Sequence, residues 1–259
     1  MLVLGPRSGV FGPWLSYRNL ILCSSVSSSK ANRVTGTPNG KPKTEDLRLT
    51  TALHSAKMHP LPLPRAFYAR DPRRVARELL GKVLVRHDRH GAMLTGRIVE
   101  VEAYLGEQDP AAHAASGKTL RNAVLFGPPG HAYVYFIYGN HYCLNVSCEP
   151  EGRAGGVLFR ALEPLSGTEQ MAQARGVELC SPKDLRKLTS GPGRLSEAFE
   201  ITRNADNGCD LTSDTSSLWI GDDGYRAREV AVTPRIGIAK AADKPLRYIL
   251  RGNPFVSGL

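Results

Sequence analysis

The chain lacks the signatures of several common protein classes. No run of apolar residues approaches the ~20 that a membrane-spanning helix needs. The five cysteines form no CxxC pair and no Cys/His set with the spacing of a zinc site. An odd, scattered set of this kind indicates reduced thiols rather than a secreted disulfide scaffold. We therefore expect a soluble, intracellular protein without a bound metal.

Acidic residues are scarce at the beginning of the chain. Residues 1–58 hold eight Lys and Arg against two acidic residues, whereas residues 59–259 hold 26 against 22. The formal net charge of +10 indicates an acidic partner, first of all nucleic acid. Because much of this charge lies in the first segment, a nucleic-acid site in the remainder must come from local clustering of basic residues.

The same segment marks a domain boundary. Residues 1–60 are rich in Ser, Gly and Pro and show no hydrophobic periodicity, which is typical of disorder. We interpret them as a disordered basic extension; an organelle transit peptide, or a start codon assigned upstream of Met58, are the alternatives. Residues 61–259 are expected to form a single domain.

The remainder predicts short strands joined by short turns. Neither an internal repeat nor alternating strands and helices with a phosphate loop is present. Helices are expected at 71–81, at 166–176 from a capping box of Ser166 and Glu169, and after 191–194. Strands are expected at 82–88, 93–104, 132–138, 142–148, 156–162, 217–220, 230–238 and 246–251. The predicted fold class is α+β, with a curved antiparallel sheet, surrounding helices and a protruding hairpin at 132–148.

One strand carries carboxylates beside aromatic residues. Glu100, Glu102 and Tyr104 alternate in the strand 93–104 and therefore share a face. Taken alone, this pattern also fits a solvated sheet surface. Tyr133 and Tyr135 share a face of a second strand, and Tyr138 falls at its turn, where a large ring is free to contact a partner. A carboxylate can activate water and aromatic rings can hold a planar ligand, which indicates hydrolysis of a bond to a heterocycle.

An ordered series of segments resembles the alkyladenine (3-methyladenine) DNA glycosylase family. It runs from about residue 62 to the C-terminus, and the series is far more specific than any one segment. The segments are 97–106 (RIVEVEAYLG), 111–113 (AAH), 121–122 (RN), 130–139 (GHAYVYFIYG), 143–146 (CLNV), 158–164 (LFRALEP) and 190–195 (SGPGRL).

The resemblance implies a role for each matching residue. Glu102 would be the general base that deprotonates a water, and Arg160 would help to orient that water. The damaged base would sit in a pocket with Asn145 at its floor. Tyr138 would intercalate into the DNA in place of the flipped nucleotide. The residues that would line the base pocket are Tyr104, His113 and Tyr135.

Less specific interpretations of these residues remain open. His113 could be a structural histidine, and Asn145 could serve only to hydrogen-bond its strand. Arg160 could be a structural ion-pair partner. The candidates for DNA backbone contacts, which could equally be solvated surface charges, are Arg121 and Arg194, with Lys118 unranked beside them.

The implied activity is that of a monofunctional glycosylase that acts as a monomer on double-stranded DNA with damaged purines. No cofactor and no membrane are implied, and the protein would be DNA-associated in the cytoplasm, nucleoid or nucleus. A damage-sensing protein without catalysis is a second hypothesis, against which the presence of Glu102 argues. A glycosylase with lyase activity is a third; it needs an amine nucleophile, and the lysine nearest the aromatic segments is Lys118.

Overall fold

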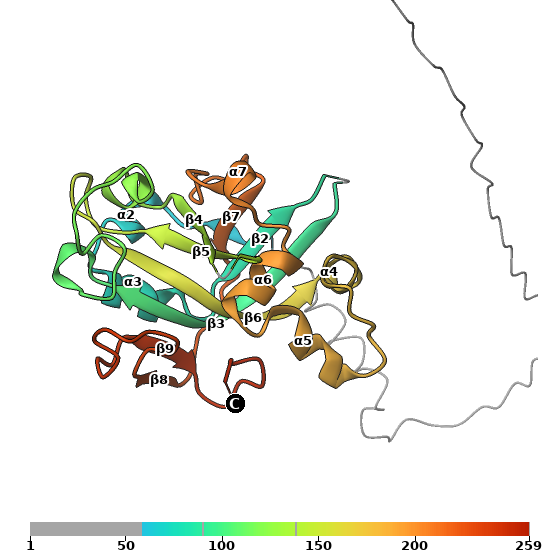
Figure 1. Ribbon diagram of the computed structural model, residues 1–259. Helices are drawn as coiled ribbons and strands as arrows, with labels where there is room; N and C mark the ends of the chain where they lie inside the picture. Colours follow the sequence, from blue (N-terminus) through green and yellow to red (C-terminus); the bar gives the residue numbers. More distant parts are fainter. Residues whose placement is uncertain (1–58, 90, 138, 259) are drawn as a thin grey trace, which may run out of the picture. The chain divides into compact units, whose positions relative to one another are not determined.

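A computed structural model describes residues 59–89, 91–137 and 139–258. The expectations for the first 58 residues and for Tyr138 lie outside this part of the chain. The described residues form a nine-stranded sheet in which every pairing is antiparallel, with helices packed against it (Figure 1). This confirms the predicted α+β class with a curved antiparallel sheet.

The sheet is built from two unequal parts. Its main path runs in the order β1-β7-β2-β3-β6-β5-β4, while β8 and β9 form a ribbon attached to β3. The strands are β1 (Leu61–Pro62), β2 (Val83–His87), β3 (Met93–Tyr104), β4 (Ala132–Ile137), β5 (His141–Ser147), β6 (Gly156–Ser166), β7 (Leu218–Asp222), β8 (Val230–Thr233) and β9 (Arg247–Leu250).

Strand β3 lies at a fork in the sheet. Its first half pairs with β2, its second half pairs with β9, and β6 lies along its other edge (Figure 1). The pairing with β6 shifts register on both sides of Glu100, which marks a β-bulge. Bulges re-aim side chains and increase local twist. The fork therefore places Glu100 and Glu102 beside β9 and the segments that flank it.

Short helices cover the sheet. They are α2 (Arg65–Tyr68), α3 (Pro72–Leu79), α4 (Thr168–Arg175), α5 (Leu185–Thr189), α6 (Pro192–Ala198) and α7 (Arg203–Asp206), with 3-10 turns η1 (Gly106–Gln108), η2 (Ala123–Phe126) and η3 (Pro182–Asp184). Helix α6 packs against β5 and β6. No helix in the described residues is long and apolar enough to cross a membrane.

Helix α3 shows how the sequence specifies the core. Asp71 accepts a hydrogen bond from the Arg73 backbone N–H, and Pro72 occupies the first turn. Its buried residues, Pro72, Val75, Ala76 and Leu79, recur at helical spacing. Full burial of one side chain such as Leu79 contributes about 1.5–3 kcal/mol. Helix α3 thereby packs against strand β3 of the sheet.

Most predicted elements are confirmed, and four boundaries are wrong. The strand expected at 156–162 extends to Ser166. Ser166 does not cap α4, because its hydroxyl hydrogen-bonds Thr95 and the Met93 carbonyl across the sheet. Gly167, with a φ of 74°, precedes the helix instead. Helix α6 begins at Pro192, within the segment after which we predicted it. The expected strand 230–238 ends at Thr233, because Pro234 cannot donate to a ladder.

Candidate active site

A cavity of about 340 Å³ opens between the β4–β5 hairpin, the loop after β3 and the segment after β8. Five of the residues predicted for the site line it. They are Tyr104, His113, Tyr135, Asn145 and Arg160. Such a concave, partly apolar pocket with few polar groups is typical of a small-molecule site. The structure thus brings together residues that lie up to 56 positions apart in the sequence.

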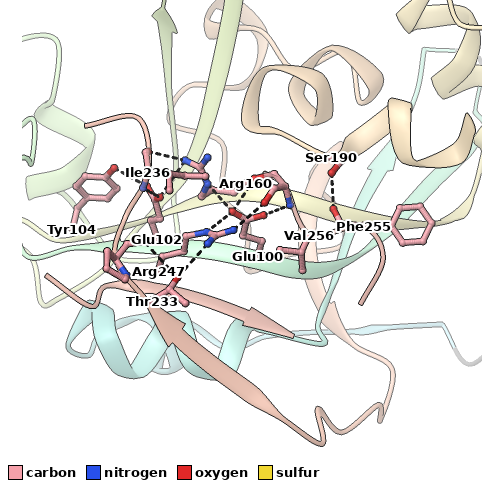
Figure 2. Close-up of polar contacts among 12 residues, drawn as sticks. Glu100, Glu102, Tyr104, Arg160, Ser190, Thr233, Ile236, Arg247, Phe255 and Val256 are labelled. Carbon is pink, nitrogen blue, oxygen red and sulfur yellow. Dashed lines mark hydrogen bonds and ion pairs between the residues drawn. The ribbon is translucent and has the colours of Figure 1, made fainter. Parts of the chain in front are cut away.

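Glu102 lies directly behind the cavity wall and is fully buried. Its Oε2 accepts a hydrogen bond from the Tyr104 hydroxyl at 2.9 Å, and its Oε1 accepts one from the Ile236 backbone N–H at 2.9 Å (Figure 2). Both donors line the cavity. A carboxylate oxygen can accept two hydrogen bonds, so Oε2 retains a lone pair that could receive a proton from water.

Arg160 joins the two carboxylates of β3. Its Nε donates to Glu100 Oε1 at 2.8 Å, and its Nη1 lies 3.2 Å from Glu102 Oε1 (Figure 2). Its side chain is only 10% exposed, so solvent and salt weaken both contacts little. Arg160 is therefore an ion-pair partner of both carboxylates. Because it also lines the cavity, this is compatible with a role in the site.

Glu100 is anchored from the other side by the C-terminal segment. Arg247 Nε donates to its Oε1 at 2.7 Å, and the Ser257 hydroxyl does so at 2.9 Å. The Ser257 backbone N–H donates to Oε2. Arg247 in turn donates to the Ser257 carbonyl (Figure 2 shows the adjoining Phe255 and Val256). Glu100 therefore holds Arg160 in place and ties it to β9 and the chain end.

The solvated-surface interpretation of the two carboxylates is wrong. Glu100 and Glu102 both have no exposed surface. Buried carboxylates persist in proteins only when they are paired and hydrogen-bonded, and here the partners come from β6, β9 and the segments at 236 and 257. This face of β3 is a polar interior, not a surface.

Aromatic rings form one wall of the cavity. The His113 and Tyr135 ring centroids are 4.4 Å apart, and those of Tyr133 and Tyr135 are 5.6 Å apart. The His113 Nδ1 hydrogen-bonds the Tyr133 hydroxyl at 2.9 Å. Partial burial lowers the pKa of His113, and the nearby Arg121 lowers it further. The imidazole is therefore neutral at pH 7, and the purely structural interpretation of His113 is incomplete because the residue lines the cavity.

The Tyr104 hydroxyl is held in its protonated form. Burial raises its pKa, and the neighbouring Glu102 carboxylate raises it further. A protonated hydroxyl can donate to Glu102 at all physiological pH values, which fixes both the ring and the carboxylate. Asn145, which lines the cavity, is buried, and its Nδ2 donates to the Tyr133 carbonyl at 3.1 Å. That bond orients the amide of Asn145.

The loop that carries His113 is braced by residues outside the predicted set. Asn122 is buried, and its Nδ2 donates to the carbonyls of His113 and Gly117. Gly106 has a φ of 67°, and a Cβ there would lie 2.0 Å from the Ala154 carbonyl oxygen. Only glycine fits this position. These contacts fix the loop against the body of the domain.

Three further site residues escaped prediction: Ile236, Arg235 and Asp109. Ile236 supplies the backbone donor to Glu102, and Arg235 precedes it. Both follow Pro234, whose presence in the sequence signals that the expected strand breaks there. Asp109 binds Arg235 at 2.5 and 2.9 Å. No local pattern could link Asp109 to a partner 126 positions away.

The basic candidates for DNA contact are exposed near the cavity. The Arg121 guanidinium lies 5.9 Å from the centre of the Tyr135 ring, and Arg194 is exposed in the first turn of α6, next to the cavity residues Pro192 and Gly193. Lys118 is exposed on the loop before Arg121. Their roles remain predictions. Tyr138 lies outside the described residues.

Comparison with known proteins gives a single family. The model of the methylpurine-DNA glycosylase family matches residues 66–254. A protein of Koribacter versatilis is 66% identical over 197 residues, which cover 76% of this chain and 93% of the relative. One of Burkholderia cenocepacia is 49% identical, with 76% and 91% covered, and one of Alkaliphilus oremlandii is 45% identical, with 75% and 98% covered. All three bear the name "Putative 3-methyladenine DNA glycosylase".

Proposed function

Because the chain belongs to the methylpurine-DNA glycosylase family, we propose that it is a monofunctional glycosylase that flips damaged purines out of duplex DNA and hydrolyses the N-glycosidic bond. This reaction starts base excision repair. The observation that carries the proposal is the placement of Glu102, a buried carboxylate held by Tyr104, Arg160 and Ile236 directly behind an aromatic cavity.

The cavity suits alkylated purines. Bases such as 3-methyladenine and 7-methylguanine carry a positive charge in DNA, and the electron-rich faces of Tyr104 and Tyr135 attract cations by about 0.5–2 kcal/mol. The neutral lesions hypoxanthine and ethenoadenine gain stacking alone. Flipping is least costly for a damaged base, because such a base gives up less pairing and stacking. The proposed substrates are therefore both alkylated and deaminated or etheno purines.

In the proposed reaction, a water oxygen bonds to the sugar C1′ as the bond from C1′ to the purine nitrogen breaks. Glu102 accepts the proton that the water releases, and the bonding electrons leave with the base. A cationic lesion thus departs as a neutral base, whereas a neutral lesion departs as an anion that takes up a proton from solvent. In both cases Glu102 afterwards releases its proton to solvent. The carboxylate also offsets the positive charge that develops on the sugar. Arg160 is a positioning residue that holds Glu102 and the cavity wall.

The proposed DNA contacts are one intercalating tyrosine and two arginines. Tyr138 would fill the gap that the flipped nucleotide leaves, and Arg121 and Arg194 would bind backbone phosphates. We propose action as a monomer that needs neither cofactor nor metal. The water nucleophile requires no amine, which separates this proposal from a lyase mechanism.

A gel assay on duplex DNA with one hypoxanthine or one ethenoadenine tests the proposal. We expect strand breakage only after treatment with alkali, because a monofunctional enzyme leaves an intact abasic strand. Breakage without alkali would show lyase activity. A mobility shift without breakage under either condition would show a protein that binds damage and does not repair it.

Asn145→Ser and Asn145→Gly should release more guanine from undamaged duplex than the wild type does. Stacking alone cannot reject guanine, so an obstructing polar group near the purine 2-position must do so. Asn145 lies buried at the cavity, and a smaller side chain opens space there. Asn253→Ser, which alters an amide outside the cavity lining, is the control. Unchanged guanine release together with normal hypoxanthine excision would show that Asn145 does not select the base.

Tyr138→Ala should reduce excision of a stably paired lesion more than excision of the same lesion opposite a mismatched base. A wedge contributes most when the extruded base gives up most pairing and stacking. Single-turnover rates on the two duplexes measure the difference. Tyr225→Ala removes an exposed tyrosine that does not line the cavity and serves as the control. Equal losses on both duplexes would contradict the wedge role.

A further inference from the structure

An ion pair lies behind the Tyr104 ring. The Arg235 guanidinium carbon is 4.6 Å from the centre of that ring. Its Nη1 and Nη2 donate to the Asp109 carboxylate at 2.5 and 2.9 Å, and neither side chain has exposed surface. Tyr104 lines the cavity and Arg235 does not. The guanidinium therefore lies over one face of a ring that lines the cavity, while Arg235 itself stays outside the lining.

A buried ion pair is not the most stable way to fill this space. Replacing a buried ion pair by apolar residues of similar volume is often neutral or stabilising. Within the described residues, Arg235 Nε also has no hydrogen-bond partner, although it is buried. A buried donor left unpaired calls for an explanation beyond packing. We therefore look for an effect of the Arg235 charge on the neighbouring Tyr104 ring and the cavity that this ring lines.

We propose that the Asp109–Arg235 pair determines the selectivity between cationic and neutral damaged bases, because it sets the net charge behind Tyr104. This inference rests on the proposed function, in which the damaged base stacks on the cavity face of Tyr104. Asp109 neutralises Arg235 and thereby allows the ring to accept a cationic purine. The pair also positions the ring and the segment that binds Glu102.

The magnitude follows from the distance. A base stacked about 3.5 Å beyond the ring lies roughly 8 Å from the guanidinium carbon. One unbalanced charge at that distance, in an effective dielectric of ~20, changes the affinity for a cation roughly 10- to 30-fold. The same charge assists the departure of a neutral lesion as an anion. An unpaired Arg235 therefore shifts the two lesion classes in opposite directions.

A structural role alone predicts a different pattern. Asp109 accepts hydrogen bonds from the backbone N–H groups of Leu105 and Ala111, and Arg235 donates to the Ala103 carbonyl. Loosening these contacts would slow excision of every lesion alike. A change in the electric field at Glu102 would also alter the excision rate of every lesion. The ratio between a cationic and a neutral lesion cancels both effects.

The test measures single-turnover excision of 7-methylguanine and of hypoxanthine, each as the rate constant divided by the half-saturating enzyme concentration. Three variants of the whole chain are compared with the wild type. They are Asp109→Asn, Arg235→Gln and the double variant Asp109→Asn/Arg235→Gln. We expect the ratio of 7-methylguanine to hypoxanthine to fall roughly 10- to 30-fold in Asp109→Asn and to rise in Arg235→Gln. In the double variant it should rise less, because the nearer charge of the pair is the positive one.

A matched control exists in the same fold. Arg97 pairs with Asp223 at 2.8 Å, and its guanidinium lies 4.1 Å from the centre of the Tyr225 ring, which does not line the cavity. Asp223→Asn should leave the ratio unchanged. If a single variant does not fold, the double variant, which leaves no charge unpaired, must still raise the ratio.

The possible outcomes separate the selectivity proposal from the proposed function. A wild type that excises neither lesion contradicts the proposed function itself. If the wild type excises only one class of lesion, binding is measured instead. The ratio compared is then that of the dissociation constants for the two lesion duplexes, with Glu102→Gln present in every variant. An active wild type with the same ratio in every folded variant, however slow, overturns the selectivity proposal and leaves the pair a structural feature.

Discussion

Glu102→Gln is expected to lower the single-turnover rate of base excision by about 10²- to 10⁴-fold, with lesion binding within a few-fold of the wild type. Gln has the same shape: its amide oxygen can replace Oε1 and accept the hydrogen bond from the Ile236 N–H, and its NH2 group can donate to the Tyr104 hydroxyl. It cannot accept a proton at neutral pH. The fold should persist, because an amide in this position leaves Arg160 paired with Glu100. Rates at saturating enzyme and mobility shifts on one lesion duplex measure the two effects.

Glu163→Gln provides the control for this variant. Glu163 lies on β6 beside β3 and accepts a hydrogen bond from Asn253, outside the cavity lining. The same chemical change there should leave excision within about twofold, as is usual for substitutions away from functional features. Substantial excision by Glu102→Gln at saturating enzyme would contradict the assignment of Glu102 as the base.

Arg160→Met is expected to reduce both stability and turnover. Removing one partner of a buried ion pair costs about 3–5 kcal/mol, because the carboxylates of Glu100 and Glu102 lose a compensating charge. For a domain of this size, each kcal/mol lowers Tm by roughly 2–4 °C. The folded fraction should also excise more slowly, since Glu102 is then held by Tyr104 and Ile236 without Arg160.

Arg86→Met separates the two losses. Arg86 pairs with the buried Asp206, its side chain is 11% exposed, and it lies outside the cavity lining. Its removal should lower Tm to a similar degree, yet leave the turnover of each folded molecule unchanged. Calorimetry together with single-turnover kinetics, corrected for the folded fraction, gives the comparison. Equal turnover per folded molecule in both variants would reduce Arg160 to a structural ion-pair partner.

The strands could be predicted because their evidence is local. Alternation of apolar residues and the turn residues between them predicted β2, β3 and the β4–β5 hairpin close to their observed bounds. The same local evidence misled at Ser166, where a capping pattern competed with cross-strand hydrogen bonds to Thr95 and Met93. The sheet contacts won because Ser166 pairs with Thr95 in the ladder with β3.

The burial of Glu100 and Glu102 could not be predicted from β3 alone. Some of the groups that cover them come from residues more than 130 positions later, at Ile236 and Ser257. The alternation of residues in the strand predicted that the two carboxylates share a face. The structure shows which groups cover that face. The resemblance to a family supplied residue roles, yet it pointed to neither Asp109 nor Arg235. Those two residues meet only because the loop after β3 and the segment after β8 pack together behind Tyr104.

Quantifying the products of wild-type protein on methylated duplex DNA tests whether the protein hydrolyses the N-glycosidic bond of damaged purines. Released bases are identified by chromatography with mass detection, and abasic sites are counted by alkaline cleavage in the same samples. We expect free 3-methyladenine and 7-methylguanine in amounts equal to the abasic sites, with strands intact until alkali is added. Methylated DNA that stays bound to the protein without release of any free base would contradict it.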